Sequence, residues 1–423
     1  MTNGQRKDSY HAAKMTQGLA ECKMGVRLGQ VSRLVWRRAQ RLSTATVVVL
    51  GGYGNAGRAI ADGLLWETQA RVVVAGRNLA RAQEVAKALS EEHAEERIGA
   101  LQVDAANPNA LVKALKGAAL VVVASSTAPY TRNVVAAALA AGCDYLDIQA
   151  SKAKLKVLRS LAKKIKASGR CFITEAGFHP GLPSALVRFV GGRMTGLTEA
   201  NVAGVMRLDW RSLQFSDSTA AEFVEVVRES RAGILRKGKW RRGYLSRGTG
   251  IRTFQFGAPF GPRRCTALHL EEMRALPQLF PSLREMGFFI AGFNWVVDKC
   301  VMPLGWLSLK ICPCFTRGFL RRLFPWALAK FSRPPFGTMV KVEAKGQLDG
   351  KPSALTLVLH HEDAYVFTAV PVVACILQYV DGDIRRPGLW TMGNLVEPER
   401  FMADMARMGL PHRIETQHNN PVR

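Results

Sequence analysis

A glycine-rich turn between a predicted strand and a predicted helix carries the sharpest chemical signal in the sequence. Gly52, Gly54 and Gly57 have the spacing G-x-G-x-x-G directly after the apolar run 46–50. This spacing lets a pyrophosphate approach the backbone, and the N–H groups at the start of the next helix attract phosphate oxygens. A structural turn is the alternative interpretation. We predict a dinucleotide site formed by Gly52, Tyr53, Gly54, Asn55, Ala56 and Gly57.

The end of the second predicted strand indicates which dinucleotide binds. NAD sites usually carry an acid there, about 20 residues past the glycines, to hold the ribose 2′-hydroxyl. This chain has Ala-Gly-Arg-Asn at 75–78, so Arg77 stands where it can pair with a 2′-phosphate. The pattern favours NADP(H). The alternative is a surface arginine that opens a helix.

Polar side chains follow two further strands of the predicted sheet. Asp104 follows the third strand, where it either contacts an adenine or caps a helix start. Ser125, Ser126 and Thr127 follow the fourth strand, where small hydroxyl residues line the path toward a nicotinamide ribose. Ligands of such sheets bind at the carboxyl ends of the strands, so these residues join the predicted cofactor site.

Hydride transfer also needs a group that delivers or removes a proton. His179, in a loop after the sixth strand, is the first candidate, and a histidine titrates near pH ~6.5; it could equally fix the loop through a backbone hydrogen bond. Asp147 and Tyr145, on one face of the fifth strand, are the next catalytic candidates, with Asp147 orienting His179 or an ammonium substrate. Glu175 is a proton relay or a structural partner, and Asp144 is expected to be solvated.

Buried strands and helices alternate from Thr44 onward, as a doubly wound α/β fold requires. Continuous Val/Ile/Leu runs indicate parallel strands that are covered on both faces. The expected strands are 46–50, 71–75, 98–103, 119–124, 144–148 and 171–174, and the helices lie near 56–67, 78–90, 107–117, 130–141 and 152–168. We predict a Rossmann domain at 44–183.

After Pro183 the regular alternation of strands and helices ends, and we predict an α+β domain at 184–365. Helices are expected near 184–195 and 217–235, followed by a basic glycine-rich stretch at 236–264. Strands at 338–347 and 353–361 flank Asp349-Gly350, a hairpin turn signal. A helix capped by Thr368 and ending near Val380 opens the last region, 366–423.

The net charge of +26 is concentrated in three windows. Residues 1–45, 231–264 and 299–341 carry +7, +10 and +8, so the rest is a near-neutral globular protein. No nucleic-acid-binding motif accompanies these windows, and we expect no specific nucleic acid partner. Residues 1–43 are a basic tail or an organelle-targeting leader. Eight scattered cysteines indicate a reducing compartment, and no metal site is predicted.

Residues 287–326 combine apolar and aromatic residues with Lys and Arg. Asp298, Lys299 and Pro303 interrupt the run, which argues against a membrane-spanning helix. Two interpretations remain: a buried or dimer-forming segment, or a helix that lies on an anionic membrane surface. We expect a cytoplasmic protein, with a membrane-peripheral location as the second interpretation.

Several of these motifs resemble those of the saccharopine dehydrogenase family. The resemblance rests on the turn 51–57, on Asp-Tyr-Leu-Asp at 144–147 and above all on Gly-Phe-His-Pro-Gly-Leu-Pro at 177–183, and it covers about 44–185. It implies a Rossmann domain, an α+β substrate and dimerisation domain, and a C-terminal helix that returns to the first. The family's best-known members use NADP(H) to reduce an imine to a secondary amine, and a homodimer is implied.

The leading hypothesis is therefore an NADP(H)-dependent oxidoreductase that acts on a C=N or related polarised double bond of a small-molecule substrate. His179 stands where saccharopine reductases commonly carry an acid, so the substrate stays open. The alternatives are a membrane-associated reductase of a lipid-like substrate and a non-catalytic NADP-binding scaffold.

Overall fold

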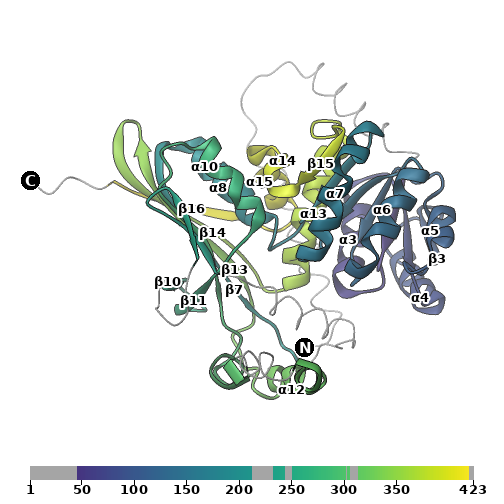
Figure 1. Ribbon diagram of the computed structural model, residues 1–423, viewed down its shortest axis with the longest axis horizontal. Coiled ribbons are helices and arrows are strands. Elements are labelled where there is room, and N and C mark those ends of the chain that lie inside the picture. Colours follow the sequence, from purple (N-terminus) through teal and green to yellow (C-terminus); the bar gives the residue numbers. More distant parts are fainter. Residues whose placement is uncertain (1–44, 212–231, 243–249, 302, 305–312, 419–423) are drawn as a thin grey trace, which may run out of the picture. The chain divides into compact units, whose positions relative to one another are not determined.

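The computed structural model describes residues 45–211, 232–242, 250–301, 303–304 and 313–418. Its first sheet has the strand order β15-β6-β5-β4-β1-β2-β3, with all pairings parallel (Figure 1). This order confirms the predicted Rossmann fold. The strands are β1 (Thr46–Leu50), β2 (Arg71–Gly76), β3 (Ile98–Gln102), β4 (Leu120–Val123), β5 (Asp144–Asp147) and β6 (Cys171–Thr174). The helices are α3 (Asn55–Glu67), α4 (Leu79–Ser90), α5 (Pro108–Leu115), α6 (Thr131–Ala140) and α7 (Lys152–Ala167).

The seventh strand, β15 (Gly388–Thr391), comes from the C-terminal region and was not predicted. It pairs in parallel with β6 over residues 171–174. The strand has only four residues, and they are not strongly apolar, so the sequence carries little strand signal there. The Rossmann sheet is therefore completed by chain that lies more than 200 residues after β6.

The second sheet has nine strands and is mixed. Seven of its strands pair in the order β10-β11-β12-β7-β13-β14-β16. Outside this order, β8 pairs with β12 and with β9. The strands are β7 (Thr195–Arg207), β8 (Gly233–Arg236), β9 (Lys239–Arg242), β10 (Ile251–Gln255), β11 (Pro262–Leu268), β12 (Glu285–Ala291), β13 (Gly337–Leu348), β14 (Lys351–His361) and β16 (His412–His418). The β13–β14 hairpin turns at Asp349 and Gly350, both with positive φ, as its sequence predicts.

The structure differs in part from the expectations for this region. The helix expected near 217–235 lies mostly outside the described residues, and 233–236 forms β8 instead. The described parts of the basic stretch 236–264 are β9, β10 and the start of β11. Residues 287–291 belong to β12, which is buried between β11 and β7, so the apolar segment does not begin as a surface helix.

Two apolar helices, α8 (Leu182–Arg193) and α13 (Ala364–Val380), join the two sheets. One hydrophobic cluster extends from Val47 of β1 through both helices to Val340 of β13. Helix α13 lies close against α3: a Cβ atom added to Gly63 would come within 3.0 Å of Val373. Its N-cap is Asp363 rather than the expected Thr368, because the Asp363 carboxylate accepts the Tyr365 and Val366 N–H groups. The resulting core is continuous.

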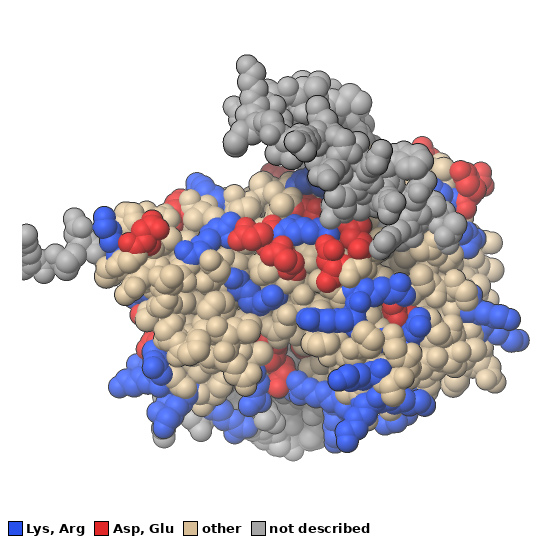
Figure 2. Space-filling model, turned by 90° about the horizontal axis from the view of Figure 1, so that it is seen from above, with Lys and Arg blue, Asp and Glu red and all other residues tan. Residues whose placement is uncertain are grey.

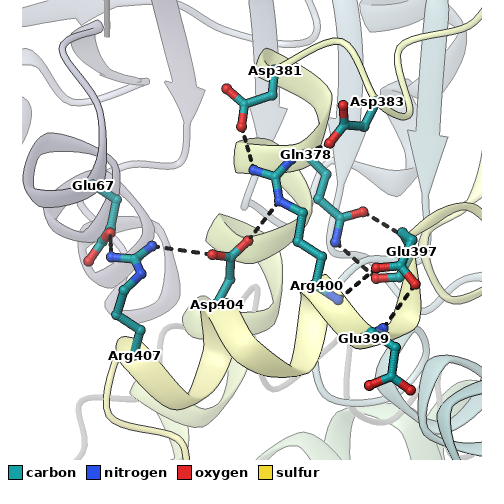
Figure 3. Close-up of polar contacts among 9 residues, drawn as sticks. All are labelled: Glu67, Gln378, Asp381, Asp383, Glu397, Glu399, Arg400, Asp404 and Arg407. Atoms are coloured by element: carbon teal, nitrogen blue, oxygen red, sulfur yellow. Dashed lines mark hydrogen bonds and ion pairs between the residues drawn. The ribbon is translucent and has the colours of Figure 1, made fainter. Parts of the chain in front are cut away.

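The C-terminal region is tied to the Rossmann half by buried and half-buried polar contacts. Asp144, expected to be solvated, is buried and accepts hydrogen bonds from the Tyr379 hydroxyl (2.7 Å) and from Arg385 (2.9 Å). In α15 (Pro398–Arg407), Arg400 pairs with Asp381 and Asp404 (Figure 3). Arg407 pairs with Glu67 of α3, as Figure 3 also shows. The expected return of the C-terminal helix therefore has an electrostatic basis.

Charged side chains are unevenly spread over the described surface. On the face seen in Figure 2, Asp and Glu gather with Lys and Arg in the upper half of the view, whereas Lys and Arg predominate along the lower edge. The basic window 1–43 lies outside the described residues. Within the described part of the chain, no helix is long and apolar enough to cross a membrane.

Candidate functional site

The glycine-rich turn closes tightly between β1 and α3. A Cβ atom added to Gly57 would lie 2.2 Å from the Gly51 carbonyl oxygen, so only glycine lets the helix approach the turn. Gly54 is the N-cap of α3, and no side chain caps the helix there. The first N–H groups of α3 are thus left for an outside acceptor, which is the arrangement that holds a pyrophosphate.

The end of β2 forms a second wall of this site. A Cβ atom added to Gly76 would lie 2.4 Å from Cε1 of Tyr53, so the Tyr53 ring packs directly on the strand end. The Arg81 guanidinium lies 5.2 Å from the centre of that ring. Arg77 is exposed beside them, and Asn78 caps α4 through the Arg81 N–H. Arg77 and Arg81 therefore both follow the end of β2, where the sequence predicts that a 2′-phosphate binds.

The loop after β4 borders the turn directly. A Cβ atom added to Gly51 would lie 2.5 Å from Cβ of Ser125, which places Ser125–Thr127 against the glycine-rich turn. Ser125 and Thr127 hydroxyls are 3.3 Å apart. Gln149, which the sequence analysis did not single out, donates to the Ser125 carbonyl and to the Thr127 hydroxyl (3.2 Å). Asp104 accepts the Ala106 N–H (3.0 Å) in the turn before α5, whereas the N-cap of α5 is Asn107, so Asp104 does not cap the helix.

A fully buried ion pair lies behind this loop. The Lys154 ammonium is 2.5 Å from Oδ1 of Asp147 and 2.5 Å from the Gln149 carbonyl oxygen. Asp147 also accepts the Thr174 hydroxyl (2.7 Å) and the Gln149 N–H (3.1 Å). The Asp147 carboxylate therefore joins the carboxyl ends of β5 and β6 to the start of α7.

Tyr145 shares the face of β5 with Asp147, as expected. Its ring stacks on Phe172 with centroids 5.1 Å apart, and the side chain is buried in the core. Burial, reinforced by the nearby Asp147 charge, holds the pKa of Tyr145 well above its ordinary value. Its hydroxyl is thus a neutral hydrogen-bonding group at physiological pH.

His179 lies in an aromatic environment after β6. Its ring centroid is 4.3 Å from that of Phe178 and 5.6 Å from that of Phe288 on β12. Burial lowers the pKa of His179 to about 4, so the imidazole is neutral near pH 7. The lowered pKa also makes the imidazole a weak base, so it would hold an accepted proton only transiently.

Two buried glutamates, Glu175 and Glu272, interact with each other, and Glu175 also lies close to the ion pair. Glu175 directly follows β6 with a φ of 57°, an unusual conformation for a residue that is not glycine, and is 5 % exposed. Burial raises the pKa of Glu175 to about 7, although the nearby Lys154 lowers it in part. Near pH 7 this carboxyl group therefore exchanges a proton readily.

Glu272, only 1 % exposed, precedes α10 (Leu276–Leu279) in a short 3-10 turn. Burial and then the charge of Glu175 raise the pKa of Glu272 to about 8, which the Gly181 and Ser184 N–H groups at the start of α8 offset in part. Among the described residues, its two oxygens lack a hydrogen bond partner of good geometry, as does Oε2 of Glu175. The two glutamates together thus carry at least one proton at neutral pH.

Three members of this arrangement escaped the sequence analysis: Gln149, Lys154 and Glu272. Lys154 lies in a lysine-rich helix whose other lysines are mostly exposed, so nothing in the sequence sets it apart. Glu272 is about 100 residues from Glu175. In the described ranges, no group of three or more His, Cys, Asp or Glu side chains is placed to hold a metal ion.

Comparison with known proteins identifies the type of the first domain and a relative with the same fold. Residues 47–173 match the family described as the saccharopine dehydrogenase NADP binding domain. The saccharopine dehydrogenase (L-Glu forming) of Saccharomyces cerevisiae has the same fold: the TM-score is 0.62 at 16 % identity, over 88 % of this chain and 100 % of that one. A dehydrogenase from Chromobacterium violaceum aligns at 9 % identity over 87 % of this chain and 94 % of its own, with a TM-score of 0.42. No protein with curated function matches the sequence significantly.

The buried ion pair generates a stability prediction. Lys154→Met leaves the Asp147 carboxylate buried without its cation, and removal of one partner of a buried pair typically costs about 3–5 kcal/mol. We expect the free energy of unfolding in urea to fall by that amount. Lys164→Met, an exposed site on the same helix, is the matched control and should change stability by less than about 0.5 kcal/mol. A loss below about 1 kcal/mol for Lys154→Met would show that the pair is not a structural constraint.

The two glutamates generate a pH prediction. Their pKa values, about 7 and about 8, lie above the ordinary value of 4.5, so the folded protein binds these protons more tightly than the unfolded chain. Stability should therefore decline as pH rises from about 4.5 to about 8.

Glu272→Gln, which mimics the protonated acid, should flatten that decline and raise stability at pH ~9 by an amount on the order of a few kcal/mol. Urea unfolding across this pH range measures the effect, with the exposed Glu91→Gln as control. Parallel pH profiles of Glu272→Gln and the parent protein would contradict the assignment.

Proposed function

We propose that this chain, whose residues 47–173 form a saccharopine dehydrogenase-type NADP-binding domain, is an NADP(H)-dependent oxidoreductase acting on a C=N or related polarised double bond. The observation that carries the proposal is the gathering of polar and titratable groups beside the cofactor turn. The Ser125 loop, the Asp147–Lys154 pair, Glu175 and the His179 loop all follow β4, β5 or β6 at one edge of the sheet. Ligands of this fold bind at that edge.

The residues fit the cofactor at three points. The uncapped start of α3 and the turn 51–57 would hold the pyrophosphate, and Arg77 with Arg81 would hold the 2′-phosphate. Ser125, Ser126 and Thr127, held by Gln149, would face the nicotinamide ribose. When bound, NADP(H) supplies or accepts the hydride.

Proton transfer is assigned to His179 and Glu175. In the oxidation of a secondary amine, the neutral His179 imidazole accepts the proton that the nitrogen loses as hydride leaves the adjacent carbon. In the reverse direction the same path returns the proton: His179 gives it to the imine nitrogen and is reprotonated by Glu175, whose pKa of about 7 suits a proton relay near neutral pH. Asp147 and Tyr145 act as positioning residues, because Lys154 neutralises Asp147 and the core surrounds Tyr145.

A lipid-like substrate is the second candidate. The observation that favours it is a group of exposed apolar side chains, Trp295, Leu304 and Trp326, which suits an enzyme that meets its substrate at a membrane. We also propose a homodimer, which the family resemblance supports. The edge strands β10 and β16 have the free sheet edges through which a second copy could pair.

Substrate-dependent oxidation of NADPH tests the function. Candidate amine and carbonyl pairs that form imines, keto acids and fatty enoyl or keto compounds are assayed in parallel. We expect turnover with the imine-forming pairs, and a loss of about 10²–10⁴-fold in kcat for His179→Ala with NADPH affinity unchanged. Turnover with lipid substrates alone would favour the second candidate. NADPH binding without turnover on any panel would identify a non-catalytic scaffold.

The cofactor assignment generates its own prediction. Arg77→Ala should weaken NADPH binding by about 10- to 100-fold, because the change removes a charge-assisted contact with the 2′-phosphate. NADH lacks that phosphate, so its affinity should stay the same. Titration calorimetry with both dinucleotides measures the effect, and Arg132→Ala, an exposed arginine on α6, is the matched control. Equal affinities of the parent protein for NADPH and NADH would contradict the assignment.

A further inference from the structure

We propose that residues 293–301, 303–304 and 313–331, which we call the aromatic lobe, bind the surface of an anionic lipid bilayer. This inference does not depend on the proposed function. It rests on the packing, exposure and charge of the lobe.

The lobe is a helical insertion between two strands of the second sheet. Strand β12 ends at Ala291 and β13 begins at Gly337, and between them lie a π-helical turn (Val297–Val301) and α12 (Pro313–Lys330). The lobe has a small hydrophobic cluster separate from the main core, composed of Trp210, Val297, Val301, Leu320, Phe324, Ala327 and Leu328. Figure 1 shows α12 below the second sheet. The described part of the lobe therefore packs around a cluster of its own.

The lobe also exposes large apolar side chains. Trp295 and Leu304 are each 65 % exposed, and Trp326 is 54 % exposed. Among the other large apolar side chains of the described chain, only Leu279, at 56 %, is as exposed as these. The two tryptophans belong to one surface because both contact the Phe331 ring edge-on, at centroid distances of 6.0 and 5.9 Å. A cluster of exposed aromatic rings is unfavourable in free energy when it contacts water, so such a cluster indicates a surface that binds a partner.

The charge around these rings is mainly positive. Lys299, Arg322, Lys330 and Arg333 are exposed, and the sequence has no acid between Lys299 and Lys341. The nearest acid, Asp298, accepts the Phe293 N–H (3.0 Å), and burial raises the pKa of its carboxyl group. The lobe therefore repels basic partners and attracts anionic ones.

An anionic bilayer matches both properties. Tryptophan rings settle at the boundary between headgroups and acyl chains, and Lys and Arg keep their ammonium and guanidinium groups among the phosphates. No described helix could span the bilayer, so the lobe would lie on the surface. An acidic protein partner satisfies the charge but gives less reason for several protruding tryptophans.

Sedimentation with lipid vesicles tests the proposal on the full chain. The vesicles contain phosphatidylcholine alone or with phosphatidylserine, at low and high salt. We expect binding to the phosphatidylserine vesicles at low salt, weaker binding at high salt, and little binding to phosphatidylcholine alone.

Two sets of variants keep the test specific. Trp295→Ala with Trp326→Ala should lower the partition coefficient by about tenfold or more, and Arg322→Glu with Lys330→Glu should do so without disturbing the apolar packing. Trp66→Ala, which removes a 48 % exposed tryptophan on α3, should bind like the parent. Circular dichroism verifies that each variant is folded.

Three outcomes would overturn the proposal. The first is no binding of the parent to anionic vesicles at low salt. The second is equal loss of binding in Trp66→Ala and the lobe variants. The third is a parent oligomer that the tryptophan variants dissociate, with no lipid binding by either, because the lobe would then be an interface between copies of the chain.

Discussion

The Asp147–Lys154 ion pair constrains the edge of the sheet on which the proposed activity depends. Both side chains are fully buried, so the pair must satisfy its own hydrogen bonds, and it does so with the Gln149 carbonyl, the Gln149 N–H and the Thr174 hydroxyl. Gln149 in turn holds the loop that borders the glycine-rich turn. The cofactor turn and the ends of β4, β5 and β6 are thus connected by one polar network. A buried pair of this kind adds little stability over an apolar alternative, but it fixes position.

Beside this edge lie two titratable side chains whose pKa values are shifted from their ordinary values. Glu175 has a raised pKa, in a backbone conformation that is seldom used without a reason, and the pKa of His179 is lowered by its aromatic neighbours. Glu175 can therefore exchange a proton near neutral pH, whereas His179 rests as an uncharged imidazole. The second sheet contributes directly, because Phe288 of β12 contacts His179. The second sheet therefore supplies a residue that lines the candidate site, in addition to supporting it.

The sequence predicts the Rossmann half well because each strand there is a short continuous apolar run between amphipathic helices. The glycine-rich turn and Arg77 follow from local spacing alone. Contacts between distant segments are not predictable in this way: β15 has a weak strand signal, and the burial of Asp144 depends on Tyr379 and Arg385, more than 200 residues later. Lys154 looks like any surface lysine of α7. The apolar segment 287–326 was ambiguous because a buried strand and a segment with exposed aromatic side chains follow each other in it.

A structure of the protein with bound NADP⁺ tests the central claim most directly. The account places the pyrophosphate at the uncapped start of α3, the 2′-phosphate beside Arg77, and the nicotinamide between the Ser125–Thr127 loop and the His179 loop. Density for the dinucleotide in that position would support the assignment of the carboxyl edge as the active site. A dinucleotide bound elsewhere, or a nicotinamide ring turned away from both loops, would contradict it.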